Sequence, residues 1–334
     1  MDNIFGDAAE RLFAQTCTPD VIRRVERGQP SGDAWQACED AGFADALVRE
    51  DHGGAGLCLA DALPVVLAAG RHLCPYPIAH TLLARAWLSR VQRPQAAGAI
   101  ALAPHGLAID GGRIAGVSVA WARSADYVLA GIDGQTWLLP MQAARVESNG
   151  VHGSLDGGVS CALSDAERLD SPGPLDTMAA AAYAGLIAGA MDRVLAMTLD
   201  YANQRAQFGK PIGRFQAVQQ QISEMAEHVW AARMAAQLAF QGDDGLPRPL
   251  LAALGKARAS LAVPRVADIA HAVHGAIGVT EEYDLQLYTR RLREWRLAAG
   301  SESHWHDRIG ADALSSRSDA LTYLRTALYG KETA

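Results

Sequence analysis

Apolar residues without a proline dominate the chain from residue 175 to residue 204. The stretch is rich in Ala, Leu and Met, which favours one long helix over 175–205. Further helices are predicted after it, over 215–240, 247–273, 282–297 and 303–328. Pro264 lies inside one of them and is expected to kink it. Long helices joined by short loops indicate a bundle.

The first part of the chain also predicts helices. Ser31 is placed to cap an early helix, a glycine-rich loop follows at 51–56, and Ala60–His72 and Pro77–Val91 read as helical segments. The pattern then changes to short β-forming runs separated by Gly-containing turns. These runs cover residues 99–102, 116–120, 127–130 and 136–139.

The patterns together predict a mainly α protein with a small β domain. We expect an N-terminal helical domain over 1–94, a small middle β domain over 95–172 and a C-terminal four-helix bundle over 173–334. A chain of 334 residues is long enough for two or three domains.

Composition narrows the possible partners and location. The formal net charge is −7 and no basic run occurs, which argues against a nucleic-acid partner. The five cysteines are scattered and form no CxxC, so reduced thiols are expected. The N-terminus has no apolar segment of the secretory type, and no uninterrupted apolar run is long enough to span a bilayer. A cytoplasmic protein without a membrane span is predicted.

The segment Arg205-Ala206-Gln207-Phe208-Gly209-Lys210-Pro211-Ile212 is the most specific motif. On physical grounds Gly209 is expected to end the preceding helix as its C′ residue. Arg205 would then cap that helix and complement its dipole. The segment, with 215–219 after it, also resembles RxQFGKPI…FQxxQ of the acyl-CoA dehydrogenases, flavoenzymes that remove two hydrogens across the α and β carbons of an acyl thioester.

This resemblance implies FAD as cofactor, an acyl-CoA substrate and an electron-transfer flavoprotein or similar acceptor. In the family the arginine that matches Arg205 reaches the FAD diphosphate of a neighbouring subunit, a task that suits a planar, permanently charged guanidinium. An oligomer follows, either of this chain alone or with a homologous acyl-CoA dehydrogenase subunit.

A second segment, residues 274–280, resembles the HGGxGxT turn beside FAD in the family. Ala276 stands in place of its second glycine and Ala272 in place of an upstream Gln, while an ordinary helix C-cap at Gly275 remains the alternative. Residues 288–291 resemble the family's YRD segment, with Arg291 in the place of the acid. The resemblance as a whole implies FAD contacts from Arg205, Gln207, Phe208, Ile212, Phe215, Val218, His274, Gly275, Ala276 and Ser301.

Two pieces of the family pattern are missing. No segment like TEPxxGSD or WxTNG, which hold the flavin in the family, occurs in the middle domain, so that domain is reduced. The carboxylate that takes the α-proton is also missing, because its two family positions are Ala299 and Ala179. Glu302 and Asp176 are the nearest acids, and each is alternatively a solvated acid at a helix end.

Other residues with chemical potential are weaker candidates. His304 and His306 are two residues apart, so on a helix they face different sides, and no metal site is predicted.

Three hypotheses remain open. The chain is a self-sufficient flavoenzyme with a displaced base, or it is one subunit of an α2β2 heterotetramer whose partner holds most of FAD and supplies the base. The reduced β domain and the missing base favour the second. In the family that this chain resembles, such heterotetramers often act on CoA thioesters of steroid side chains. The third hypothesis is a structural or regulatory homologue that has lost FAD.

Overall fold

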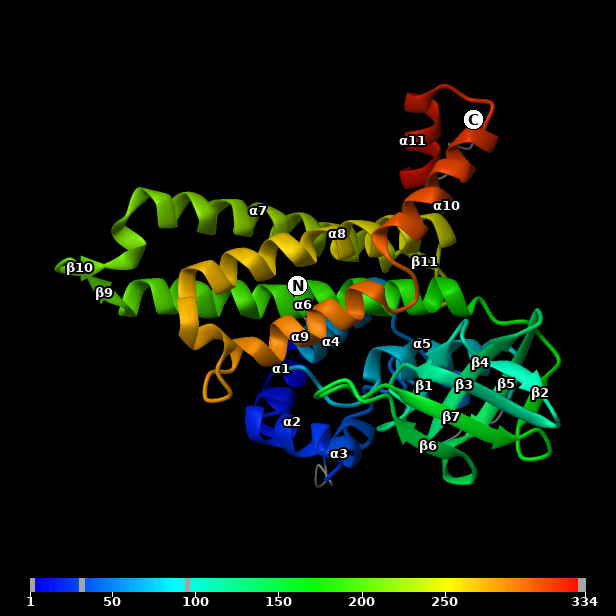
Figure 1. The fold of residues 1–334 in the computed structure, drawn as a ribbon. Coiled ribbons are helices and arrows are strands. Elements are labelled where there is room, and N and C mark those ends of the chain that lie inside the picture. The colour runs from blue at the N-terminus through cyan, green and yellow to red at the C-terminus, as the bar shows by residue number, and fades with distance from the viewer. Residues whose placement is uncertain (1–3, 30–33, 94–96, 330–334) are drawn as a thin grey trace.

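A computed structural model describes residues 4–29, 34–93 and 97–329 (Figure 1). Its N-terminal part is helical, with helices α1 Ile4–Thr16, α2 Pro19–Glu26, α3 Ala34–Asp40, α4 Leu59–Arg71 and α5 Ile78–Arg90, and a short 3-10 turn η1 Glu50–His52. The helices predicted at 60–72 and 77–91 are confirmed as α4 and α5. The proposed cap Ser31 lies outside the described residues.

The middle part holds two four-stranded sheets. One has the order β1-β4-β5-β8 and the other β2-β3-β7-β6, and only the β1–β4 pair is parallel. The strands are β1 Ile100–Ala103, β2 Ala108–Asp110, β3 Arg113–Val119, β4 Tyr127–Ile132, β5 Gln135–Pro140, β6 Arg145–Ser148, β7 Gly157–Ala162 and β8 Glu167–Leu169, with a 3-10 turn η2 Met141–Ala143. The four predicted runs fall on or beside β1, β3, β4 and β5. The other four strands carry weaker apolar patterns, since they are short or glycine-rich.

The C-terminal part is a bundle built around α6 Leu175–Gln204. Helix α6 packs against α4, α5, α7, α8 and α9, so it is buried on most sides. By length and composition alone it would cross a bilayer, but 89% of its most apolar window is inside the protein, as expected for the central helix of a bundle. The other helices are α7 Gln216–Ala239, α8 Pro249–His274, α9 Leu285–Leu297, α10 Glu302–Ser315 and α11 Ala320–Tyr329.

Short elements connect the long helices. They are β9 Ala206–Gln207, β10 Lys210–Pro211, η3 Ile212–Arg214, β11 Gly242–Asp243, β12 Leu246–Pro247 and η4 Gly275–Val279. The β9–β10 hairpin lies at one end of the bundle, whereas the β domain lies against the other end (Figure 1). Helix α8 continues through Pro264.

Two predictions about helix ends are wrong. The helix expected over 303–328 is two helices, α10 and α11, because the Asp319 carboxylate accepts the Leu321 and Thr322 N–H groups and starts a new helix. Gly209 is not the C′ residue of α6, which already ends at Gln204. Gly209 instead lies in the turn of the β9–β10 hairpin.

Candidate functional site

The β9–β10 hairpin gathers several of the predicted cofactor residues. Gln207 pairs with Lys210, so Phe208 and Gly209 form a two-residue turn, with φ of 51° and 77°. A positive φ is unfavourable for a bulky residue such as Phe208. Its side chain is nevertheless 92% exposed, touching the ring of Phe215 at 6.2 Å between centroids. An exposed aromatic ring held in an unfavourable conformation indicates a contact surface.

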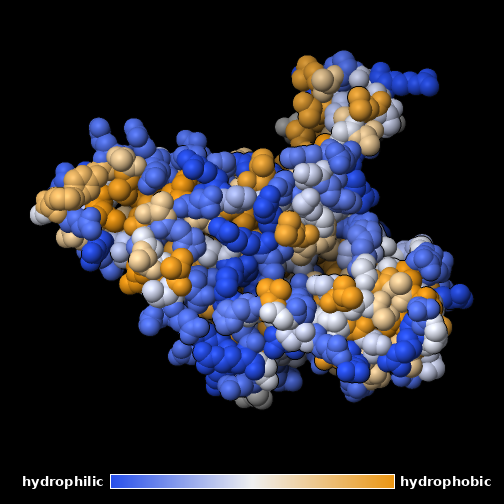
Figure 2. Space-filling view, viewed as in Figure 1, coloured by the Kyte–Doolittle hydropathy of each residue, from blue (hydrophilic) through white to orange (hydrophobic). Residues whose placement is uncertain are grey.

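Arg205 stands at the base of this hairpin. Its backbone N–H donates to Tyr201 and its carbonyl accepts from Ile212, so the main chain is fixed. The residue is exposed, and within the described part of the chain no acid or carbonyl pairs with its guanidinium. Figure 2 shows apolar surface at the same end of the bundle. The hairpin therefore presents a free cation beside exposed apolar groups.

His274 joins this end of the bundle from α8. Its ring stacks on Tyr201, with centroids 4.5 Å apart, and its Nδ1 donates to the Ala270 carbonyl at 2.8 Å. Its Nε2 accepts from the Tyr283 hydroxyl at 3.2 Å. Burial lowers the pKa of His274, so the imidazole is neutral. Both ring nitrogens of His274 therefore have hydrogen-bond partners within the protein. The turn that follows His274 is exposed.

That turn begins at Gly275, which is the C-cap of α8 with a φ of 66°. A Cβ at this position would meet no atom within 4 Å, so the backbone is open to an incoming group. Ala276 is exposed beside it, while Ile212, Phe215 and Val218 are half-buried at the start of α7. The structure thus brings nine of the ten predicted cofactor residues to one end of the bundle.

Ser301 is the exception. It is the N-cap of α10, where its Oγ accepts the His304 N–H at 3.5 Å, and it lies next to Ala299 and Gly300 in the loop between α9 and α10. The buried Lys256 ammonium fixes this loop by donating to the carbonyls of Arg296 and Gly300 at 2.9 and 3.0 Å.

A cleft of about 410 Å³ lies between this loop and the β domain. Ala299, one of the two family positions for the base, lines it. Four titratable residues line the same cleft: His105 from the loop after β1, Asp156 from the loop before β7, Tyr183 from α6 and Glu294 from α9. A cleft lined by several titratable residues is a candidate site for proton chemistry. The other family position, Ala179, is fully buried in α6.

The two acids nominated from the sequence are both paired. The Arg296 guanidinium donates two hydrogen bonds to the Glu302 carboxylate, one of 3.0 Å. These bonds hold the pKa of Glu302 below its usual range. Asp176 lies in the first turn of α6 and contacts His105 at 2.7 Å and Arg308 at 3.2 Å. A carboxylate stabilised as an anion by a cation is a weak proton acceptor.

Asp156 was missed by the sequence analysis. Burial and then the nearby Glu294 carboxylate raise the pKa of Asp156 to about 6. The backbone N–H of Trp121 donates to its Oδ1 at 3.0 Å. No periodicity or motif marks this residue, which stands in a loop before two glycines. Only the fold brings it to the cleft.

The segment that resembles YRD, in α9 of the bundle, makes hydrogen bonds to both the N-terminal helical part and the β domain. Arg291 donates to Glu26 of α2 at 3.0 Å, to Glu294 at 2.9 Å and to the Gly153 carbonyl at 3.1 Å. Arg290 reaches the other oxygen of Glu26 at 3.0 Å and the His152 carbonyl at 2.8 Å. The Arg that replaces the family acid therefore holds the loop that leads to Asp156.

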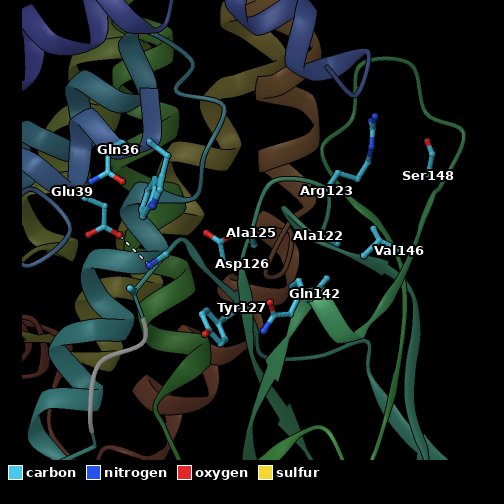
Figure 3. Close-up of a pocket in the computed structure, with 14 residues that line it drawn as sticks. Gln36, Glu39, Ala122, Arg123, Ala125, Asp126, Tyr127, Gln142, Val146 and Ser148 are labelled. Atoms are coloured by element: carbon cyan, nitrogen blue, oxygen red, sulfur yellow. Dashed lines mark hydrogen bonds between the residues drawn. The ribbon is translucent and has the colours of Figure 1, made fainter. Parts of the chain in front are cut away.

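Another cleft, of about 880 Å³, lies between α3 and the β domain (Figure 3). None of the predicted site residues lines it. Its carboxylates serve the fold, since Glu39 accepts from Arg85 and from the Gly98 N–H, and Asp126 accepts from the Ala99 N–H at 2.7 Å. Across the described residues no group of three or more His, Cys, Asp or Glu is arranged to hold a metal ion.

The hairpin and the 410 Å³ cleft are far apart. Tyr183 lies in α6 and Arg205 directly follows the last residue of that helix, so a rise of about 1.5 Å per residue separates them by about 33 Å along its axis. Arg205 therefore cannot serve a molecule bound in the cleft of its own chain.

Comparison with known proteins gives a consistent result. Residues 177–314 match the family description "Acyl-CoA dehydrogenase, C-terminal domain". The chain is 34% identical over 288 residues to Acyl-CoA dehydrogenase IpdE2 of Mycobacterium tuberculosis, covering 84% of this chain and 87% of that protein. It is 30% identical over 301 residues to IpdE2 of Mycolicibacterium smegmatis, covering 86% and 91%.

Solved structures share the fold. The ChsE4-ChsE5 complex from Mycobacterium tuberculosis matches with a TM-score of 0.78 at 22% identity, covering 95% of this chain and 99% of that chain. The Tcur3481-Tcur3483 steroid ACAD G363A variant matches with a TM-score of 0.77 at 24% identity, covering 93% and 98%. The resemblance and fold class expected from the sequence are confirmed, and this chain belongs to the acyl-CoA dehydrogenase family.

Proposed function

We propose that this protein is a subunit of an FAD-dependent acyl-CoA dehydrogenase that works as a mixed assembly with a homologous subunit. The observation that carries the proposal is the position of Arg205, an unpaired cation about 33 Å along α6 from the chain's own cleft. The guanidinium fits a diphosphate, and the open backbone at Gly275 lies at the same end of the bundle. Both groups would serve FAD held mainly by the neighbouring subunit.

The reaction would be the α,β-dehydrogenation of an acyl-CoA thioester. FAD supplies the hydride acceptor when it is bound. The residues of this chain would bind and orient it, with Arg205 on the diphosphate and the Phe208 ring excluding water at the boundary. Both family positions for the carboxylate, 299 and 179, are alanine in this chain.

The relatives support a mixed assembly and a bulky acyl group. A complex of two different chains, ChsE4-ChsE5, shares the fold, and so does a protein described as a steroid ACAD. We extend both points to this chain, with an electron-transfer flavoprotein or similar acceptor taking the electrons.

Co-expression with a base-containing homologue tests the proposal. The assembly should purify yellow, hold FAD, and show bleaching of the flavin absorbance when a bulky acyl-CoA is added. The chain alone should retain little FAD and should therefore turn over acyl-CoA poorly. Flavin-free protein in every assembly would instead identify a structural or regulatory homologue. Ordinary turnover by the chain alone would refute the division of labour.

A further inference from the structure

The 410 Å³ cleft holds one carboxylate that forms no direct ion pair with a cation among the described residues. Glu294 is paired with Arg291 at 2.9 Å, and His105 at the edge is paired with Asp176. Asp156 accepts one backbone N–H on Oδ1, and within the described part of the chain no side chain pairs with it. A half-buried carboxylate without an ion-pair partner is costly, and such groups concentrate at functional sites.

The carboxylate is also held in place. Its own backbone N–H donates to Ser154 Oγ at 3.1 Å, and Trp121 fixes Oδ1 at 3.0 Å. The residues just before it are tied to the rest of the protein, because Arg291 and Arg123 donate to the carbonyls of Gly153 and Ser154. A base whose geometry is set before the substrate arrives is what proton transfer requires.

We propose that Asp156 accepts a proton from the α-carbon of an acyl thioester bound in this cleft. The inference rests on the proposed function only for the substrate class. It gives the chain a proton acceptor of its own, on the β domain, facing the loop where Ala299 replaces the family carboxylate.

The step is balanced without an oxidant. The α-C–H bond breaks, an O–H bond forms on Asp156, and the electron pair moves onto the thioester oxygen as an enolate. Tyr183 lines the same cleft, and we assign its hydroxyl as the donor to that oxygen. Burial raises the pKa of Tyr183 well above its usual value, so the hydroxyl keeps its proton and can donate.

Protonation energetics agree with this role. Desolvation and Glu294 raise the pKa of Asp156 to about 6, while Trp121 and Arg291 act in the opposite direction. A carboxylate with a pKa near the working pH is both ionised and basic. Glu294 is less suitable, because the Arg291 guanidinium stabilises its anion.

Proton exchange tests the assignment without flavin. The full chain, purified alone, is incubated in D₂O with acetoacetyl-CoA, whose α-C–H is acidic, and deuterium uptake is followed by NMR above the solution background. Wild type should accelerate exchange, with a midpoint near pH 6. Asp156→Asn, which keeps the acceptor for Trp121, should slow it by about 10²-fold or more. Asp165→Asn, an exposed acid of the same domain, is the matched control and should exchange as wild type.

The outcomes separate the two proposals. Equal exchange in wild type and a folded Asp156→Asn variant, or no acceleration by wild type, overturns the role of Asp156. In either case FAD retention by the assembly still decides the proposed function. If Asp156→Asn fails to melt cooperatively, Asp156→Glu replaces it. That variant keeps a carboxylate and should retain part of the exchange, with a shifted midpoint. If Asp156→Glu exchanged at the wild-type rate and with the wild-type midpoint, the position of the carboxylate would not matter and the assignment would be overturned.

Discussion

The Tyr201 ring stacks on the His274 imidazole with centroids 4.5 Å apart and planes inclined by 25°. This contact joins the last turn of α6 to the last turn of α8. It places the Arg205 hairpin and the Gly275 turn, which are far apart in sequence, at one end of the bundle. Each of these groups alone is an ordinary helix end, and together they form a candidate site for a diphosphate.

The first prediction concerns Arg205. In an assembly that holds FAD, Arg205→Ala should weaken FAD retention about tenfold or more, since a hydrogen bond to a charged group is worth about 1.5–3 kcal/mol. Arg205→Lys keeps the charge but loses the planar fork, so it should recover only part of the affinity. Flavin titration of the three proteins in the same assembly measures this. Equal affinity in all three would leave Arg205 as a simple helix cap.

The second prediction concerns the aromatic stack. Tyr201→Leu removes the ring that lies on His274 and should cost about 0.5–1.5 kcal/mol in unfolding free energy beyond the change in buried area. It should also weaken FAD retention, because the two halves of the candidate site are no longer held together. Tyr201→Phe keeps the stack and is the control. Urea unfolding and flavin titration of both variants check the prediction, which fails if Leu and Phe behave alike.

The third prediction concerns the oligomer. On α7 the side chains of Trp230 and Met234 are 59% and 65% exposed, and Leu261 of α8 is 49% exposed. Such apolar groups on neighbouring helices indicate a subunit contact. We expect sedimentation to show a dimer of dimers at micromolar concentration, and the Trp230→Glu, Met234→Glu double variant to sediment as a smaller species.

Val117→Glu gives the control for that experiment, because Val117 is 89% exposed but lies on β3, outside the bundle. It should leave the sedimentation coefficient unchanged. A wild-type protein that sediments only as a monomer would contradict the prediction outright.

Much of the fold follows from local pattern. The long helices and four of the strands are visible in the sequence because apolar periodicity and turn residues mark them. The break between α10 and α11 was missed because Asp319 acts as a cap within a segment that otherwise favours helix. The hairpin turn was missed for another reason. Phe208 adopts a positive φ that its side chain disfavours, which no propensity predicts.

The residues of the candidate site also differ in how far the sequence alone reveals them. Arg205 and the turn at Gly275 lie in contiguous motifs, so the sequence reveals them. Asp156 depends on a contact between a β-domain loop and two helices that are distant in sequence, and Arg291 gains its role only through Glu26 in the N-terminal part. Contacts of this kind are set by tertiary packing, which a single sequence does not display.

The last prediction links Asp156 to stability. Its pKa in the folded protein is about 6, above the ordinary value of 3.8, so the folded state binds the proton more tightly than the unfolded state. The stability contributed by the protonated form is fully present below about pH 4 and is lost as the pH rises through 6. At pH 8 the half-buried anion therefore destabilises the fold. Asp156→Asn should raise the unfolding free energy there by up to about 3 kcal/mol.

The gain should shrink as the pH falls from 6 towards 4, where the wild-type carboxyl is neutral as well. Urea unfolding of wild type and Asp156→Asn across this range measures the difference, with Asp165→Asn as the exposed control. A variant more stable than wild type at pH 8 and impaired in proton exchange would show that this carboxylate is kept at a cost to the fold. A difference in stability that does not change with pH would place the pKa of Asp156 outside this window.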